Sequence, residues 1–210
     1  MKIRFLFLIF LSLSFLTIVV AQEQKMSANE VSKFQDVMRK TVQIKTLIAD
    51  FVQYKKVGYV KKELVSSGKF YVKNPDKLAW FYTSPTAYTM VFNNKKMTIE
   101  EKGKKKAMDL SRNRQFEKIS QAIQGSMSGA IYEDAEFSAS YFRTTKQYIL
   151  KLDPLPKELK KSIKQLVLHF DKSTNQVSEV RLMDNSNGST RFVFTNHKVN
   201  STLADSVFDL

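Results

Sequence analysis

The sequence predicts a mainly β protein: a meandering antiparallel sheet, large enough to curl toward a barrel, with two helical segments packed on it. From Ala49 to Lys198 most segments alternate apolar and polar residues with a period of two, as half-buried strands do. Groups of Gly, Pro, Asn and Asp separate these segments at hairpin spacing, which favours antiparallel pairing of consecutive strands.

The first 21 residues have the pattern of a secretory signal peptide. Lys2 and Arg4 precede an apolar run from Phe5 to Val20, and small residues end it at Ala21. The run is shorter than the roughly 20 residues that span a bilayer comfortably, which favours cleavage over a retained membrane anchor. We therefore expect residues 1–21 to be removed and residues 22–210 to form a single exported domain.

Charge and cysteine content narrow the classes of partner. The chain has no cysteine, so neither disulfides nor an acyl anchor on its own N-terminus are available, and packing alone must stabilise the fold. Its net charge of +14 favours anionic surfaces. Because export makes nucleic acid improbable, we expect lipid headgroups or acidic partner proteins instead.

The first segment of the mature chain with a regular pattern has the spacing of an amphipathic helix. The segment Ala28–Ile48 is predicted to be a helix, capped by Ser27 or Asn29. Its apolar stripe contains Val31, Phe34 and Met38.

About eleven strands are expected after this helix. They are Ala49–Lys56, Glu63–Lys73, Leu78–Thr83, Tyr88–Phe92, Met97–Glu101, Lys105–Asp109, Glu136–Thr144, Gln147–Asp153, Ser162–Asp171, Gln176–Asp184 and Ser189–Lys198.

A second amphipathic helix interrupts the strands. Its apolar residues fall at helical spacing in an otherwise polar segment: Phe116, Ile119, Ile123 and Met127. Two readings remain open, a helix packed permanently over the sheet and a lid that moves to admit a ligand.

Catalytic and metal-binding patterns are not found in the sequence. The only histidines are His169 and His197, and with no cysteine neither fits a metal site. No serine lies in a nucleophile elbow and no glycine-rich loop precedes a helix. Asp134 and Glu136 are an acidic pair that we expect to lie in a solvated loop. We therefore predict no catalytic residues, no metal and no cofactor.

Large apolar side chains are abundant, with sixteen Phe, eight Tyr, eight Met and one Trp. Most of them are expected to form an ordinary core. A barrel of about eleven strands, however, has an interior wider than its own side chains can fill, so either helices plug it or a ligand enters it. Aromatic and Met side chains suit an adaptable apolar cavity.

Two lysine clusters flank predicted hairpin turns. They are Lys55, Lys56, Lys61 and Lys62, and Lys102, Lys104, Lys105 and Lys106. Both clusters should project into solvent, where they either dock on acidic membranes or partners or keep the protein soluble.

Several motifs resemble the LolA family of periplasmic lipoprotein carriers. The stretch Ser67–Pro85 has the family's order of Gly, strand, Pro, apolar residue, Trp and second Pro. Ala49–Gln53 is similar to its small-x-Phe-x-Gln strand, and Val91–Lys95 to its strand–turn–Lys hairpin. Thr195–Asn200 with Phe208 resembles its last strand and tail, whereas residues 102–160 match only in layout.

This resemblance implies an unclosed antiparallel barrel whose concave side is covered by helices. It implies a monomeric periplasmic carrier that takes acylated lipoproteins, or other lipidic cargo, from an inner-membrane lipoprotein-releasing transporter to an outer-membrane acceptor. The implied acyl-chain cavity is lined by Phe51, Phe70, Val72, Leu78, Trp80 and Tyr82. The implied lid carries Phe116, Ile119, Ile123 and Met127.

One position departs from the family pattern. Well-known members place an arginine directly before the first proline, where it holds the empty lid shut, and this chain has Asn74 there. An amide offers neutral hydrogen bonds in place of a guanidinium's charged ones. Asn74 is the expected lid-latch position.

Two other classes of function are compatible with the sequence. One is a periplasmic sensor or regulatory domain that binds lipids or peptides on the same fold. The other is an enzyme on this fold, because a fold does not dictate function. An enzyme should bring polar groups together inside the cavity, and the sequence shows no such group.

The signal-peptide assignment predicts a mature chain that begins at Gln22. Intact-mass measurement of the exported protein should give the mass of residues 22–210. A chain that retains Met1 and fractionates with the membrane would contradict the assignment.

Overall fold

The computed structural model describes residues 22–40, 44–58, 62–93, 96–108, 117–122, 125 and 135–210. Within them a 12-stranded sheet runs in the order β1-β8-β9-β10-β11-β12-β2-β3-β4-β5-β6-β7. The strands are β1 (Gln24–Lys25), β2 (Thr46–Lys56), β3 (Leu64–Lys73), β4 (Lys77–Ser84), β5 (Tyr88–Asn93), β6 (Lys96–Glu101), β7 (Lys104–Met108), β8 (Phe137–Arg143), β9 (Gln147–Pro154), β10 (Gln165–Asp171), β11 (Val177–Met183) and β12 (Ser189–Val199).

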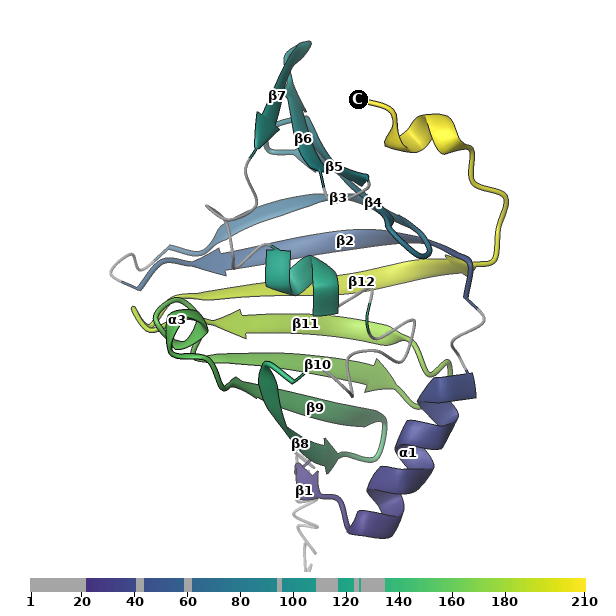
Figure 1. Ribbon diagram of the computed structural model, residues 1–210, viewed down its shortest axis with the longest axis vertical. Helices are drawn as coiled ribbons and strands as arrows, with labels where there is room; N and C mark the ends of the chain where they lie inside the picture. The colour runs from purple at the N-terminus through teal and green to yellow at the C-terminus, as the bar shows by residue number, and fades with distance from the viewer. Residues whose placement is uncertain are drawn as a thin grey trace, which may run out of the picture.

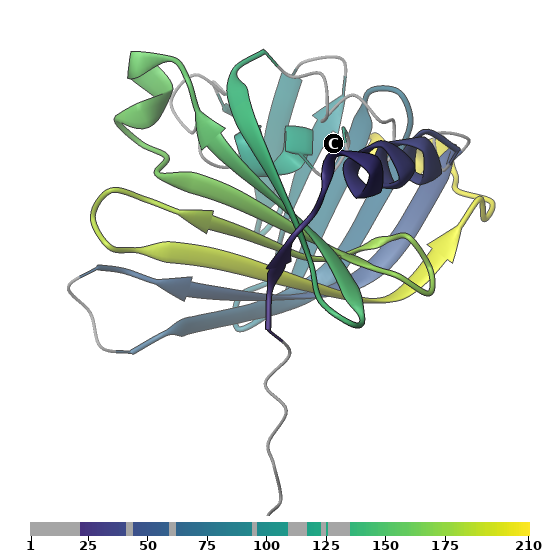
Figure 2. The same cartoon turned by 90° about the horizontal axis from the view of Figure 1, so that it is seen from below.

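The sheet is antiparallel and open. Its edge strands, β1 and β7, do not pair with each other in the described part of the chain, so the barrel is not closed. The sheet curves, and helix α1 (Ala28–Lys40) and the short helix formed by residues 117–122 lie on its concave side (Figures 1 and 2). The mainly β class is thus confirmed.

Each of the eleven expected strands is present, with ends that shift by a few residues. The strand that the sequence did not predict is β1, where Gln24 pairs with Arg143 and Lys25 with Phe142. Two polar residues on an edge have no hydrophobic alternation, so no pattern marks them.

Helix α1 begins with a capping box. The Ser27 hydroxyl accepts a hydrogen bond from the backbone N–H of Glu30 at 3.4 Å, and the Glu30 carboxylate accepts one from the backbone N–H of Ser27 at 2.9 Å. Each side chain satisfies a donor that the first helical turn leaves unpaired. Ser27 is therefore the cap, one of the two residues expected.

The expected end of the first helix, at Ile48, is wrong. Helix α1 ends at Lys40, and Thr46–Ile48 already belong to strand β2, where Leu47 pairs with Val72. Leu47 has the same strand parity as Ala49 and Phe51, so the period of two extends further back than the sequence analysis placed it.

One face of the sheet carries the main core. The cross-strand pairs Phe70–Trp80 and Val72–Leu78 place their side chains on the concave side, where all four are fully buried. Gly68 sits at a register shift beside them, and a Cβ there would lie 1.9 Å from the carbonyl oxygen of Phe81. Glycine is therefore needed where β3 bends against β4.

The convex face of β3–β5 is covered by the end of the chain. Ala79 and Val91 pack there against Leu203 and Phe208, the latter in a short 3₁₀ helix, η4 (Asp205–Phe208). The Asp205 carboxylate accepts hydrogen bonds from Lys77 at 2.8 Å and Lys73 at 3.0 Å, which lower its pKa. The tail seen at the upper right of Figure 1 thus covers a second, smaller core.

None of the helices among the described residues combines the length and the apolar content needed to cross a bilayer.

The apolar contacts and the ion pairs that hold the tail should contribute very different amounts to the free energy of unfolding. Phe208 is 1% exposed, so Phe208→Ala should lower the free energy of unfolding by about 3–5 kcal/mol, because it removes a buried ring and leaves a cavity. Asp205→Asn removes only solvent-exposed ion pairs and should cost far less. Urea unfolding followed by circular dichroism measures both. Equal losses would contradict this account of the tail.

Candidate functional site

The concave face is a cluster of aromatic rings centred on Trp80. The ring centroid of Trp80 lies 4.4 Å from that of Phe70, 4.7 Å from that of Phe192 and 4.9 Å from that of Phe51. The Phe51 contact is edge-to-face, the arrangement that the charge distribution of aromatic rings favours. Strands β2, β3, β4 and β12, adjacent in the sheet, supply these rings.

All six residues expected to line the cavity lie in this concave core. Phe51, Phe70, Val72, Leu78, Trp80 and Tyr82 are each at most 4% exposed. Sequence reasoning missed other members of the same face. They include Met90, Leu150, Leu168, Phe192 and Phe194. The shared strand parity of Phe192 and Phe194 was a signal that could have identified them.

A tyrosine pair adds polar atoms to this apolar face. The Tyr82 hydroxyl donates a hydrogen bond to the Gln53 side-chain oxygen at 2.8 Å, and its ring stacks on that of Tyr88 at 4.3 Å. Burial raises the pKa of both phenols, most strongly that of Tyr82. Both groups are therefore neutral at physiological pH, and the face holds no charge at this point.

Helix α1 covers the β8–β10 part of the concave face. The Phe34 ring contacts those of Tyr148 at 5.0 Å, Phe170 at 5.5 Å and Tyr141 at 6.0 Å. The Gln35 amide donates to the Tyr141 hydroxyl at 3.0 Å. These contacts, with the buried Met38, hold α1 against three strands.

The second cover is the 117–122 helix. Its apolar contacts come from Ile119 and Ala122, which are 3% and 1% exposed and belong to the main core. The Lys118 ammonium forms an ion pair with Glu136, although Lys118 itself is 8% exposed. Of the four expected lid residues, Ile119 lies on this helix and is buried in the main core. The other three, Phe116, Ile123 and Met127, lie outside the described residues.

The expected latch residue, Asn74, lies in the turn between β3 and β4. Its side-chain amide donates a hydrogen bond to the Ile44 carbonyl at 2.7 Å, and its backbone N–H bonds to the Lys45 carbonyl at 2.9 Å. Both bonds tie the turn to the start of β2. A latch role for Asn74 stays a prediction.

The convex face carries the polar cluster of the molecule. His169 lies on the face opposite Leu168, as the strand parity predicts, and its Nδ1 is 3.2 Å from the Gln147 side-chain oxygen. Burial lowers the pKa of His169, although the nearby Glu179 carboxylate raises it in part. In the described part of the chain no group of three His, Asp or Glu side chains could hold a metal ion.

A polar groove of about 870 Å³ lies beside His169 on this convex side. Its lining includes Gln24, Arg143, Lys146 and Asp171. Most of the lining side chains are charged or amide groups, which suit a polar ligand better than an acyl chain. The concave aromatic face therefore remains the candidate site for an apolar ligand.

Comparison with known proteins agrees with this geometry. The family model of outer membrane lipoprotein carrier protein LolA matches residues 42–210. No curated protein sequence matches the chain.

Solved structures share the fold at low sequence identity. The crystal structure of MucB is 10% identical, with a TM-score of 0.50 over 88% of this chain and 64% of MucB. The LolA superfamily protein NE2245 from Nitrosomonas europaea is 9% identical, with a TM-score of 0.46 over 84% of this chain and 97% of that one. LprF from Mycobacterium bovis is 13% identical, with a TM-score of 0.47 over 86% and 97%. At 10% identity, the likeness to MucB shows the fold alone.

The Lys118–Glu136 ion pair should hold the 117–122 helix on the sheet. Lys118→Met keeps most of the apolar stem but removes the charge, so backbone amides of residues 117–122 should exchange hydrogen about tenfold faster. Lys161→Met is the matched control, because it breaks an exposed pair with Glu158 at 2.7 Å in another segment. Exchange mass spectrometry measures both. Equal rates in wild type and Lys118→Met would mean that this ion pair does not hold the helix.

Proposed function

Because the chain belongs to the LolA family of outer membrane lipoprotein carriers, we propose that it carries acylated lipoproteins, with their acyl chains held against the concave face of the sheet. The observation that supports this most directly is the aromatic cluster around Trp80, on the curved side of a sheet that does not close. A closed barrel would fix the volume of its interior, whereas an open sheet can widen to admit a ligand.

The chemistry of this face suits an alkyl chain. Each methylene group transferred from water into apolar surroundings contributes about 0.8 kcal/mol, so a long acyl chain supplies ample binding energy without a polar anchor. Aromatic rings offer broad apolar contact, and Met90 and Met97 can repack around chains of different shape. The proposed cavity residues are the six that the sequence analysis expected, from Phe51 to Tyr82.

Entry of a ligand requires a cover to move, and we assign that role to the segment around the 117–122 helix. In the described residues this helix is held by Ile119, Ala122 and the Lys118–Glu136 pair. Helix α1 is held against the sheet by three ring contacts of Phe34 and a 2.7 Å ion pair between Glu30 and Arg143. In this proposal the 117–122 helix therefore serves as the lid, and helix α1 stays in place.

The remaining steps are proposed by analogy with the family. The exported protein would receive its cargo from a lipoprotein-releasing transporter of the inner membrane, cross the periplasm and pass the cargo to an outer-membrane acceptor. Binding and release need no bond to be made or broken, so the proposal assigns no catalytic residue and no cofactor.

Binding of acyl chains can be followed through Trp80, the only tryptophan of the chain. A synthetic acylated peptide should change its emission in a saturable way, and the same peptide without the acyl chains should not. Emission that responds equally to both peptides would favour a peptide-binding regulator instead.

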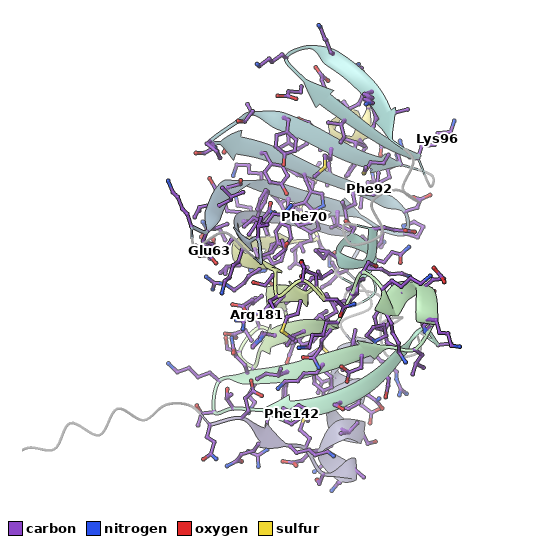
Figure 3. The ribbon with its side chains drawn as sticks, turned by 90° about the vertical axis from the view of Figure 1, so that its left-hand side faces the viewer. Glu63, Phe70, Phe92, Lys96, Phe142 and Arg181 are labelled. Carbon is purple, nitrogen blue, oxygen red and sulfur yellow. The ribbon has the colours of Figure 1, made fainter. Side chains whose placement is uncertain are left out.

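Two matched variants assign the site to one face. Phe92 and Phe81 are both half-buried, but Phe92 packs against the concave core and Phe81 against the convex one (Phe92 is labelled in Figure 3). Phe92→Ser should weaken affinity for the acylated peptide about tenfold, because it removes apolar contact from the proposed cavity. Phe81→Ser should leave the affinity unchanged. Equal effects of the two substitutions would exclude the concave face as the site.

A further inference from the structure

We propose that one end of the sheet docks on anionic membrane surfaces. Three neighbouring segments form this end, which we call the ledge: the β2–β3 hairpin (residues 55–58 and 62–65), the β11–β12 loop (residues 184–188) and the segment 155–164, which contains helix α3 (Lys157–Lys160). The inference goes beyond the proposed carrier role, since it concerns a surface and not the acyl site.

The ledge is one continuous surface. A Cβ on Gly58 of the β2–β3 hairpin would meet the Ser186 carbonyl of the β11–β12 loop, so the two backbones are in contact. The Asn185 amide of the same loop donates a hydrogen bond to the Lys160 carbonyl of α3. The three segments project on the same side of the molecule, at the left in both Figure 1 and Figure 2.

Lysines dominate the charge of the ledge. Its exposed basic residues are Lys55, Lys56, Lys62, Lys157, Lys160, Lys161 and Lys164. Of these, only Lys161 pairs with a carboxylate among the described residues, that of Glu158. The other acidic residues of the ledge are Asp184, which bonds to its own loop, and Glu63, labelled in Figure 3. The excess of positive charge favours an anionic partner.

The ledge also exposes aliphatic side chains. Leu64, Val65 and Leu155 are 54%, 50% and 50% exposed, and they are the large hydrophobic residues that the described part of the chain leaves exposed. All three lie on the ledge, between or beside its lysines. Basic groups combined with protruding aliphatic groups are the pattern of surfaces that enter the headgroup region of a membrane.

The geometry of the hairpin favours a membrane over an acidic protein. Leu64 and Val65 are consecutive in strand β3, so their side chains point to opposite faces of the sheet. A protein surface would contact one face of the hairpin and leave the other aliphatic group in water. A lipid headgroup layer is fluid and can surround Leu64 and Val65 on both faces.

The second lysine cluster, on β6–β7, serves as an internal comparison. Lys104, Lys105 and Lys106 are exposed on the edge strand β7, where charge prevents pairing with another chain. No large aliphatic side chain is exposed on the described part of this hairpin. It therefore has the charge of the ledge without the apolar groups.

The test is co-sedimentation of the mature protein with vesicles that contain no lipoprotein. Phosphatidylcholine vesicles with phosphatidylglycerol should bind the protein at low salt, and vesicles of phosphatidylcholine alone should not. The triple variant Lys56→Gln, Lys62→Gln, Lys160→Gln should weaken binding roughly 100-fold, since each lysine near an anionic surface contributes about a fivefold factor. The control Lys104→Gln, Lys105→Gln, Lys106→Gln removes the same charge and should weaken binding less than tenfold.

A second pair of variants tests the aliphatic groups. Leu64→Ser with Val65→Ser should weaken binding to the anionic vesicles at least fivefold without changing net charge. Circular dichroism and the Trp80 response to the acylated peptide should be unchanged, so failure of the docking and failure of the carrier role are distinguishable. Equal losses in the two lysine variants, no loss in the serine variant, or binding to an acidic protein but not to vesicles would overturn the proposal.

Discussion

The architecture depends on one constraint: a curved, open sheet presents a broad apolar concave face, and that face has to be covered. Each large ring of this face that stayed exposed to water would cost about 2–3 kcal/mol, and Phe51, Phe70 and Trp80 are at most 1% exposed. Helix α1 covers the β8–β10 part of the face, and Ile119 and Ala122 of the 117–122 helix belong to the same buried core. In the proposed carrier role, one of these two covers moves while the other stays in place.

The pairing of β12 with β2 lets a chain with hairpin connections form one continuous sheet. This contact joins residues far apart in sequence, such as Phe194 and Phe51, and places the C-terminal tail beside β3 and β4. The tail then covers the convex apolar patch, so both faces of the β3–β5 region are buried. The sheet still has two edges. At β7 consecutive lysines make pairing with another chain unfavourable, which is a common protection for exposed edges.

Period-two alternation was sufficient to predict eleven of the twelve strands in the described residues and to assign Trp80, Leu78 and Tyr82 to one face. The prediction failed where the local sequence pattern favours one secondary structure and tertiary contacts impose another. Leu47 and Ile48 continue a plausible helical stripe, yet pairing with Val72 and Tyr71 places them in β2. Strand β1 and helix α3 are too short to show any periodicity. The Lys118–Glu136 pair joins residues that sequence reasoning assigned to a helix and a solvated loop, so only the three-dimensional structure could identify it.

If the 117–122 helix is the lid, as we propose, lid and cargo compete for the same concave face. An acyl chain that enters beside Trp80 must replace the contacts that Ile119 and Ala122 make with the core, and it offers methylene groups of the same chemistry. The lid and the acyl chain therefore offer nearly equal apolar contact, so small polar interactions decide which of them occupies the concave face. The ion pair of Lys118 with Glu136 favours the closed state only by the excess of its attraction over the cost of burying the Lys118 ammonium, so its net contribution is small. A carrier needs such a balance, because a lid that closes too firmly excludes the cargo and one that closes too weakly leaves the aromatic face open to water.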